Sequence, residues 1–383
     1  MLLLEHDGKE LLAGYGLPVA QGLLVETAGA FDESRLPPGP WVVKAQVPTG
    51  GRGKAGGIRM ADSPAQARGH LQALLGSKLK GHTVHGCRIE QRVQGGTEAY
   101  LSLSADGASG GVRILMSAQG GVEIESMIEG VLSVVCAPDL DALRAGIDGL
   151  AESVPAASRG VLREAGHRLA EAFMASEALL VEVNPLFVRP DGRWLAGDAK
   201  LILDDNALAR HPQLVAMAHE RRQAYPETEF KLTEDFDYID LDPDGEVGLV
   251  TTGAGLSMML VDQLAESGLS AFNFVDMRTG QMKGDPHRLV LVFERMRRGR
   301  RIKVLLVNVF AGITHLGEFS RLLVQALGQV PALQGVPIVA RLLGNGLEEA
   351  QQVLADAGVP VYLETDLEEA LARVTMLVKG TGR

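Results

Sequence analysis

The stretch VVKAQVPTGGRGKAGG, Val42–Gly57, decides the first half of the fold because a glycine fingerprint follows an apolar run. Gly51, Gly53 and Gly56 match the dinucleotide pattern GxGxxG, but that pattern requires a helix next, and the following GGIRMA reads as a strand. The Walker A pattern fails too, because its Gly-Lys pair is not followed by Ser or Thr. The stretch therefore predicts a glycine-rich hairpin whose backbone N–H groups can cover a triphosphate, with Lys44 on the preceding strand supplying positive charge.

The alternative interpretation of this stretch is an exposed flexible turn in which Arg52 and its basic neighbours are incidental. Further along, Glu90 and Glu98 flank a loop in EQRVQGGTE. We expect these two side chains to hydrogen-bond the ribose and adenine edges of a nucleotide, and the alternative is that they are ordinary surface glutamates.

A second group of polar residues follows in LLVEVNPLFVRPDGRWLAGDAKL. Alternation along a strand puts Glu182 and Asn184 on one face, and a turn at RPDGRW brings Asp198 on the next strand beside them. Hard oxygen ligands on neighbouring strands suit a magnesium ion that also holds nucleotide phosphates. Cross-strand acids are common on solvated faces, so this prediction gains its weight from the glycine hairpin.

The 383 residues are enough for two or three units with cores of their own. The first half mixes short strands with helices, including three β-rich segments from GCRIEQRV to GVRILMSAQG and an interrupted helical region up to about Ser176, which predicts an α+β unit. A change of composition between Tyr225 and Asp244 indicates a boundary. Five strand-then-helix repeats follow and predict a doubly wound parallel sheet with ligands at the carboxyl ends of its strands.

Composition excludes several classes of protein. A net charge of -11 with dispersed basic residues argues against nucleic acid as a partner. Cys87 and Cys136 form neither a disulfide framework nor a zinc motif, and no apolar run approaches the length of a membrane span. The start MLLLEHDGKELL is too short and too quickly acidic for a signal peptide, so we expect a cytoplasmic protein without a membrane partner.

The motifs, taken in order, resemble the β subunit of ADP-forming succinyl-CoA synthetase over almost the whole chain. Those that carry the resemblance are YGLPVAQG, GPWVVKAQVPTGGRGKAGG, GGVEIE (Gly120–Glu125), LLVEVNPL, GDAKL, GAGLSM, NFVDM and LLVNVFAGI. The resemblance implies an ATP-grasp domain over residues 1–225, a linker over 226–244 and a flavodoxin-like CoA-ligase domain over 245–383.

The resemblance also implies roles for particular residues. Those that match the nucleotide site are Lys44, Gly51, Arg52, Gly53, Glu90, Val93 and Glu98. Asn184 and Asp198 match the magnesium ligands, and Glu182 matches the glutamate that faces a phosphohistidine. In that family the phosphorylated histidine, in a GHAGA loop, and most of the CoA site lie on a separate α subunit. None of the nine histidines here lies in such a loop, so the resemblance implies ATP and Mg²⁺ on this chain and an α subunit as partner.

The sequence departs from the family where the acid substrate binds. The residues matched to the substrate site are Thr252, Gly253, Arg278, Gly312, Ile313, Thr314 and His315. Thr252 replaces an asparagine, RTGQ replaces a run of glycines, and FAGITH replaces FGGI followed by Val or Met. We expect Thr252, Arg278, Thr314 and His315 to converge on a small pocket, and the helix N-termini at Gly253 and Gly312 to receive the anionic end.

Loss of an amide that binds a carboxylate costs about 1–3 kcal/mol, so these changes predict a short polar acid other than succinate, such as a hydroxy, polycarboxylic or sulfonated acid. The alternatives are drift in an ordinary succinate enzyme, an ATP-grasp ligase that joins an acid to an amine, and a non-catalytic nucleotide-binding regulatory subunit. The retained Lys44, Glu182, Asn184 and Asp198 argue against the regulatory subunit.

Overall fold

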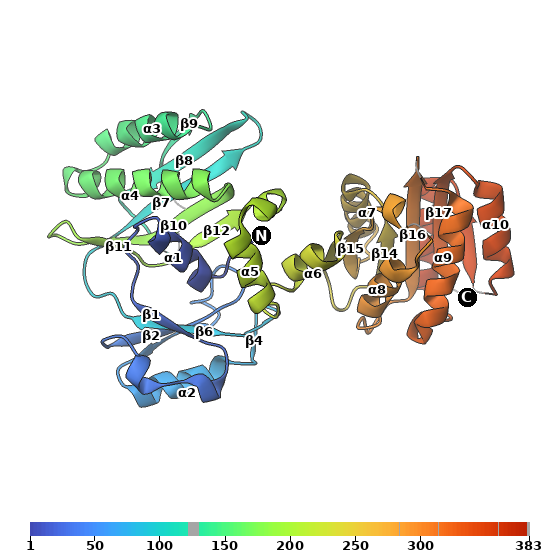
Figure 1. Cartoon of the computed structure of the whole chain (residues 1–383), viewed down its shortest axis with the longest axis horizontal. Helices are drawn as coiled ribbons and strands as arrows, with labels where there is room; N and C mark the ends of the chain where they lie inside the picture. The colour runs from blue at the N-terminus through green and yellow to red at the C-terminus, as the bar shows by residue number, and fades with distance from the viewer. Residues whose placement is uncertain (122–129, 283, 313, 359, 381–383) are drawn as a thin grey trace. The chain divides into compact units, whose positions relative to one another are not determined.

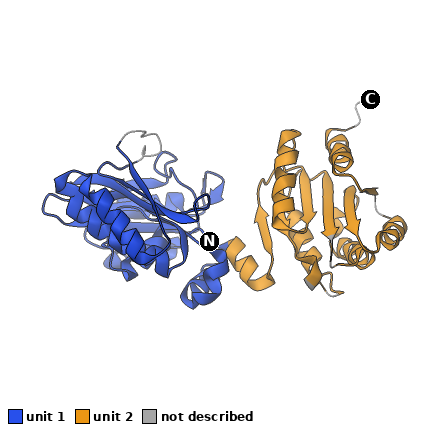
Figure 2. Ribbon diagram, turned by 90° about the horizontal axis from the view of Figure 1, so that it is seen from above, with its two compact units in different colours: residues 1–225 blue, residues 226–383 orange. Residues whose placement is uncertain are grey.

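The computed structural model describes residues 1–121, 130–282, 284–312, 314–358 and 360–380. It forms two compact units, Met1–Tyr225 and Pro226–Arg383, coloured separately in Figure 2. Each unit is a mixture of helices and sheet with a hydrophobic core of its own.

The first unit contains two larger antiparallel sheets and the two-stranded pair β4-β5 (Figure 1). The smaller has the order β1-β6-β2-β3, and the larger has the order β11-β10-β7-β8-β9 with β12 also paired to β10. The elements of the unit are α1 (Glu5–Gly14), β1 (Gly22–Val25), η1 (Ala28–Ala30), η2 (Glu33–Arg35), β2 (Trp41–Ala45), β3 (Ile58–Ala61), α2 (Pro64–Leu74), β4 (Lys78–Leu79), β5 (His82–Thr83), β6 (Cys87–Gln91), β7 (Thr97–Asp106), β8 (Gly111–Ser117), β9 (Leu132–Cys136), α3 (Leu140–Glu152), α4 (Ala156–Ala175), β10 (Ala178–Val188), β11 (Trp194–Ala196), β12 (Lys200–Leu203), η4 (Asp205–Arg210) and α5 (Pro212–Glu220).

Local sequence explains the packing of the smaller sheet. The Ser63 side chain accepts a hydrogen bond from the Gln66 backbone N–H and Pro64 occupies the first turn, so α2 begins where the sequence predicts a capped helix. Leu71 of α2 is fully buried in one cluster with Val43 of β2 and with Ile89 of β6. This packing fixes the strand that carries Lys44.

The larger sheet contains a strand that the sequence does not predict. The interrupted helical region expected up to Ser176 includes β9, in which half-buried and exposed residues alternate along Leu132–Cys136. Such alternation is typical of an edge strand, and five residues are too few for the period to stand out in the sequence. The helices α3 and α4 follow it and pack against the same sheet, as Figure 1 shows.

The second unit has a four-stranded parallel sheet between two layers of helices, and a separate pair of strands, β13 and β15. Its elements are α6 (Pro226–Glu234), β13 (Asp237–Asp240), β14 (Val247–Thr251), α7 (Ala254–Glu266), β15 (Asn273–Asp276), η5 (Thr279–Gln281), α8 (His287–Met296), β16 (Val304–Ala311), α9 (Leu316–Gln329), η6 (Pro331–Leu333), β17 (Ile338–Gly344), α10 (Leu347–Asp356), β18 (Val361–Glu364) and α11 (Leu367–Lys379). The strands β14, β16, β17 and β18 are hydrogen-bonded in that order and run parallel.

Alternation along β16 shows why helices cover both faces of this sheet. Leu306 belongs to a cluster with α7 and α11, whereas Val307 belongs to a second cluster with α8, α9 and α10. Both faces are therefore apolar, as expected for a doubly wound fold. The predicted order of an α+β unit followed by a doubly wound unit is confirmed. The second of the five expected strands, β15, pairs antiparallel with β13.

The linker expected over residues 226–244 is instead structured. It contains α6 and β13, and Phe230, Phe236 and Tyr238 are buried in the core of the second unit. The Phe230 ring makes edge-to-face contacts with the other two, with ring centroids 4.8 and 5.9 Å apart. The many acids and prolines of this stretch mask the signal of the three aromatic residues in the sequence.

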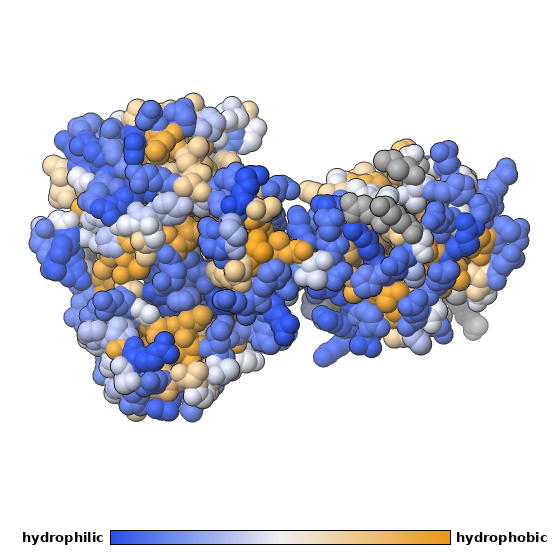
Figure 3. Space-filling view, viewed as in Figure 1, coloured by the Kyte–Doolittle hydropathy of each residue, from blue (hydrophilic) through white to orange (hydrophobic). Residues whose placement is uncertain are grey.

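The visible surface is largely hydrophilic. Figure 3 shows blue residues over most of each unit, with apolar residues in separate patches, in keeping with the net charge of -11. Across the described residues, no helix combines the length and apolar character needed to cross a bilayer.

Candidate functional site

The glycine stretch forms the hairpin that the sequence predicts. It joins β2 to the antiparallel β3, in which Lys44 is opposite Ile58. The loop closes on itself because the Gly57 N–H donates to the Arg52 carbonyl at 2.8 Å and the Ala45 N–H donates to the Gly57 carbonyl at 2.8 Å. Gly51 has a φ of 67°, a left-handed conformation that glycine adopts without strain.

The two cations of this hairpin share a carboxylate from α1. Lys44 is 8% exposed, and its Nζ donates to Glu5 Oε1 at 2.7 Å and to the Gly197 carbonyl at 2.8 Å. Arg52 Nη2 lies 2.8 Å from Glu5 Oε2 and donates to Asp198 Oδ2 at 2.8 Å. The hairpin, α1 and the turn between β11 and β12 therefore meet at one charged cluster.

Glu90 belongs to this cluster as well, whereas the sequence predicts that it faces a ribose or adenine edge. Its carboxylate accepts hydrogen bonds from Lys9 at 2.8 and 2.9 Å and from Arg88 at 2.7 Å, and it lies 2.8 Å from Lys44 Nζ. Glu90 is 2% exposed because its strand, β6, is central in the smaller sheet. Its two oxygens are engaged by cations of the protein itself.

The electrostatic balance favours the charged forms of Lys44 and Glu5 although both side chains are buried. Burial opposes the charge of Lys44, but Glu5, Glu90 and Asp198 more than offset this effect and raise its pKa. Burial likewise opposes ionisation of Glu5, yet Lys44, Lys9 and Arg52 hold the pKa of that carboxyl well below its usual value. Asp198 differs, because burial, with a further contribution from Glu5, raises its pKa.

Strand register brings the predicted metal ligands together. β10 pairs with β11 at Leu186 and Ala196 and with β12 at Glu182 and Lys200, so Asn184 and Asp198 fall opposite each other between these pairs. Asn184 uses its amide on a backbone group, since its Oδ1 accepts from the Gly121 N–H at 2.7 Å. Asn184 and Asp198 are both half-buried.

The pair fits the chemistry of a magnesium site. A carboxylate oxygen and an amide oxygen are hard ligands, and Mg²⁺ in nucleotide enzymes takes one or two protein ligands together with phosphates and waters. In the described part of the chain, no group of three or more His, Cys, Asp or Glu side chains is arranged to hold a metal.

Two other residues expected at the nucleotide site lie in the loop after β6 and at the start of β7. Val93 is half-buried in the loop after β6, and Glu98 is exposed at the start of β7. The Glu98 carboxylate approaches Gly121 so closely that a Cβ at this glycine would lie 2.7 Å from Oε2. Most of the GGVEIE motif, and Ile313 of the substrate site, lie outside the described residues.

Of the four residues expected to converge on one pocket of the second unit, Thr314 and His315 line a common cavity, whereas Thr252 and Arg278 are not among its described lining residues. Arg278 adopts a left-handed conformation with a φ of 48° and forms an ion pair with Asp235 at 3.1 Å. A second acid, Asp237, lies 3.7 Å from its other guanidinium nitrogen. Arg278 is therefore engaged by the segment that was expected to be a linker, which is why sequence alone misplaces it.

His315, like Arg278, lies beside a carboxylate of the protein. It is the N-cap of α9, its side chain is 49% exposed, and its Nδ1 lies 3.5 Å from Glu349 Oε2. The ring packs so closely on Gly346 that a Cβ there would lie 2.3 Å from it. Gly253 is the N-cap of α7, as expected. Gly312 is not at a helix N-terminus, because α9 begins at Leu316. Thr252 is half-buried between β14 and α7.

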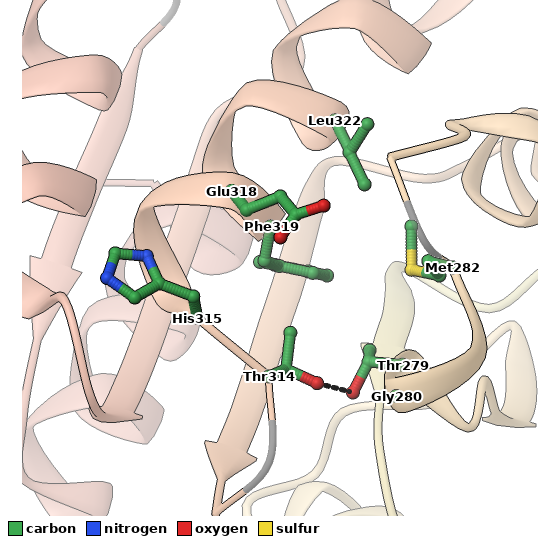
Figure 4. Close-up of a pocket in the computed structure, with 8 residues that line it drawn as sticks. All are labelled: Thr279, Gly280, Met282, Thr314, His315, Glu318, Phe319 and Leu322. Carbon is green, nitrogen blue, oxygen red and sulfur yellow. Dashed lines mark hydrogen bonds between the residues drawn. The ribbon is translucent and has the colours of Figure 1, made fainter.

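A cavity of about 260 Å³ lies next to Thr314. Its lining residues are Thr279, Gly280, Met282, Thr314, His315, Glu318, Phe319 and Leu322. Thr314 Oγ1 donates to Thr279 Oγ1 at 2.9 Å. Figure 4 shows these two side chains pointing toward each other and the His315 ring pointing away from them. Neither Arg nor Lys is among the described residues that line the cavity. Thr279 thus replaces Arg278 as the partner of Thr314.

The residues that sequence reasoning missed are mainly on α1. Glu5 and Lys9 lie four residues apart on the face that also buries Leu12, and Lys9 is 0% exposed. Charged residues in line with a buried leucine are the sequence signal that would have found them. Arg88, 1% exposed beside Glu90, gives a similar signal in a strand.

Comparisons with known proteins agree with this architecture. The model of the ATP-grasp domain family matches residues 2–188, and the model of the CoA-ligase family matches residues 250–375. The ATP citrate lyase from Methanothrix soehngenii has the same fold, with a TM-score of 0.71 and 19% identity over 97% of this chain and 98% of that one. The two family matches thus define a protein with an ATP-grasp domain followed by a CoA-ligase domain.

Curated relatives narrow the class. The chain is 36% identical to the β subunit of the ADP-forming succinate–CoA ligase from Chloroflexus aggregans, over 93% of this chain and 93% of that protein. It is 34% identical to the corresponding subunit from Desulfurococcus amylolyticus over the full length of both. The chain belongs to the β-subunit family of ADP-forming succinate–CoA ligases.

Proposed function

We propose that the chain is the nucleotide-binding β subunit of an ADP-forming acid–CoA ligase, which converts an acid, ATP and CoA into acyl-CoA, ADP and phosphate. The observation that carries this proposal is the meeting of Lys44 and Arg52 beside Asp198, opposite Asn184, in a chain of this family. A buried cationic hairpin beside two hard oxygen ligands is suited to the charge of a triphosphate.

In this proposal, the first unit holds and orients ATP. Lys44 and Arg52 neutralise phosphate charge, and the N–H groups of the hairpin around Gly51 and Gly53 lie against the phosphates. Asn184 and Asp198 would hold Mg²⁺, which supplies further neutralisation of the phosphate oxygens when it is bound. Catalysis then rests on positioning and charge rather than on a covalent group of this chain.

The phosphoryl group is transferred to a histidine of a partner α subunit, which also holds most of the CoA. Glu182, one alternation along β10 from Asn184, is proposed to accept a hydrogen bond from that histidine. The histidine passes the phosphoryl group to the acid, and the CoA thiolate then displaces phosphate from the acyl phosphate. The names of the relatives, which are β subunits, support a partner of this kind.

We further propose that the acid is a short polar one other than succinate, such as a hydroxy, polycarboxylic or sulfonated acid. Thr252, and the pair of Thr279 and Thr314 beside the cavity, support hydroxyl recognition. The names of the relatives favour the second candidate, an ordinary succinate ligase, and so does the pairing of Arg278 with Asp235, which removes one expected cation from the substrate.

The first prediction separates a catalytic β subunit from a regulatory one. The isolated chain is expected to bind MgATP and to form no acyl-CoA, because the histidine and most of the CoA site are proposed to lie on its partner. Mixed with a candidate α subunit, ATP and CoA, it should release phosphate only when an acid is present. Thioester synthesis by the chain alone would contradict the proposal, as would an acid-independent release of phosphate by the mixture.

The second prediction concerns the acid, measured by competition in the reconstituted complex. A hydroxy acid should be used with a higher kcat/KM than succinate, and Thr314→Val should reduce that preference by roughly tenfold, since it removes one hydrogen-bonding group. Thr375→Val, whose hydroxyl bonds within α11, is the control. Because Arg278 is held by Asp235, Arg278→Ala should leave the ranking unchanged. A complex that prefers succinate and ignores Thr314→Val is an ordinary succinate ligase.

A further inference from the structure

Lys9 is fully buried on α1, yet no step of the proposed reaction uses it. It is 0% exposed, and its Nζ lies 2.7 Å from Glu5 Oε1 and donates to both Glu90 oxygens at 2.8 and 2.9 Å. It also donates to the Gly197 carbonyl at 2.8 Å, the same oxygen that Lys44 contacts. A buried ammonium costs several kcal/mol of desolvation, and all of its contacts point to the nucleotide cluster.

The two carboxylates that Lys9 contacts are the ones that hold the phosphate-binding cations. Glu5 contacts Lys44 and Arg52, and Glu90 contacts Lys44. Two carboxylates this close to a phosphate site repel an incoming nucleotide and compete with it for Lys44. A third cation behind them reduces both effects, and the attraction is strong because the cluster is shielded from water.

We propose that Lys9 is a positioning residue of the nucleotide site, which neutralises Glu5 and Glu90 so that Lys44 and Arg52 remain available to the phosphates. The Gly197 carbonyl, one residue before Asp198, is fixed by the same ammonium. The inference rests on the proposed nucleotide site and adds a residue to it. A purely structural role for Lys9 would require only that its charge be paired.

The test measures the affinity of the full chain for MgATP, MgADP and AMP by calorimetry. Lys9→Met should weaken MgATP binding by about 10–100-fold, as is typical when a supporting residue behind a ligand-binding group is lost. The loss should grow with the number of phosphates, since unbalanced carboxylates repel phosphate charge, and AMP should be affected least. Equal losses for all three nucleotides would overturn the proposal, as would wild-type affinity in the variant.

Two companion variants distinguish charge neutralisation by Lys9 from a purely structural role, because the two roles predict opposite changes in MgATP affinity. Glu5→Gln should bind MgATP at least as tightly as wild type, and the Glu5→Gln/Lys9→Met double variant should recover most of the affinity lost in Lys9→Met. A purely structural role of Lys9 predicts weaker MgATP binding in all three variants. The double variant also guards against misfolding of the single variants, because replacing a buried ion pair as a unit is often neutral for stability. Weak MgATP binding by the folded double variant overturns the proposal.

Asp7→Asn is the matched control on the same helix. Asp7 is buried, but its carboxylate contacts Arg221 and Tyr225 and not the cluster around Lys44. It should keep wild-type affinity, and a loss equal to that of Lys9→Met would show that α1 acts only through folding. If the wild-type chain binds no MgATP, the proposed function fails, whereas wild-type binding with an unaffected Lys9→Met variant rejects only the role of Lys9.

Discussion

Replacing Glu182 by glutamine is expected to abolish most phosphoryl transfer to the partner's histidine while leaving MgATP binding intact. The carboxylate is proposed to accept a hydrogen bond from the imidazole and to stabilise its positive charge, and glutamine keeps the shape but not the charge. Groups in such a role contribute about 10²–10⁴-fold to rate. Labelling of the α subunit from γ-phosphate-labelled ATP, in a single turnover with the reconstituted complex, measures this step directly.

The control is Asp106→Asn, because Asp106 lies at the end of β7 in the same sheet and pairs with Arg113. It should label at the wild-type rate. The two measurements, labelling and MgATP affinity, separate a role of Glu182 in phosphoryl transfer from a role in nucleotide binding. Glu182 lies opposite Lys200 in the pairing of β10 with β12. Labelling at the wild-type rate in Glu182→Gln would remove the proposed role, and a matching loss of MgATP affinity would move Glu182 into the nucleotide site.

The fold could be predicted from patterns that depend on neighbouring residues alone. The glycine hairpin follows from Gly51 and its neighbours, and the parallel sheet follows from strands such as Val304–Ala311, whose apolar residues serve both faces. The same reasoning misjudges residues 226–244 because acids and prolines outnumber the three aromatics that bury this segment. A few large side chains decide such a segment, and composition averages them away.

The site was only partly predictable from the sequence. The residues that were misplaced form ion pairs with charged residues far away in the sequence. The sequence predicts Lys44 and Arg52 in the glycine hairpin and Asp198 at a magnesium ion that also holds the phosphates, and in the structure the three share one cluster. Glu90 was expected to face the nucleotide, but Lys9 and Arg88 engage it from elements distant in sequence.

Arg278 illustrates the same limitation in the second unit. A residue after a strand was expected to face the ligand edge of the sheet, yet Asp235, more than forty positions earlier in the chain, forms an ion pair with it. Pairing between distant charges is decided by the fold, and a single sequence carries no periodicity that reports it. Thr279, the next residue, makes the contact with Thr314 instead.

Lys44→Met should weaken MgATP binding by about 10²–10³-fold, the usual effect of removing one preorganised donor from a buried, charged site. The effect has two parts, because the phosphates lose a cation and the carboxylates of Glu5 and Glu90 lose the charge that lies within 2.8 Å of each of them. Both parts act against an anionic ligand. Calorimetric titration of the isolated chain with MgATP measures the change without any partner.

Lys78→Met is the matched control for this variant. Lys78 is an exposed lysine on β4 of the same unit, and its replacement by methionine removes the same charge. If net charge alone governed binding, both variants would lose affinity to a similar extent, and added salt would abolish the difference between them. A large loss confined to Lys44→Met, persisting at high salt, is the expected result because the cluster is buried and little screened. Wild-type affinity in Lys44→Met would show that the nucleotide binds elsewhere on the chain. It would also contradict the proposed role of the glycine hairpin in binding the phosphates.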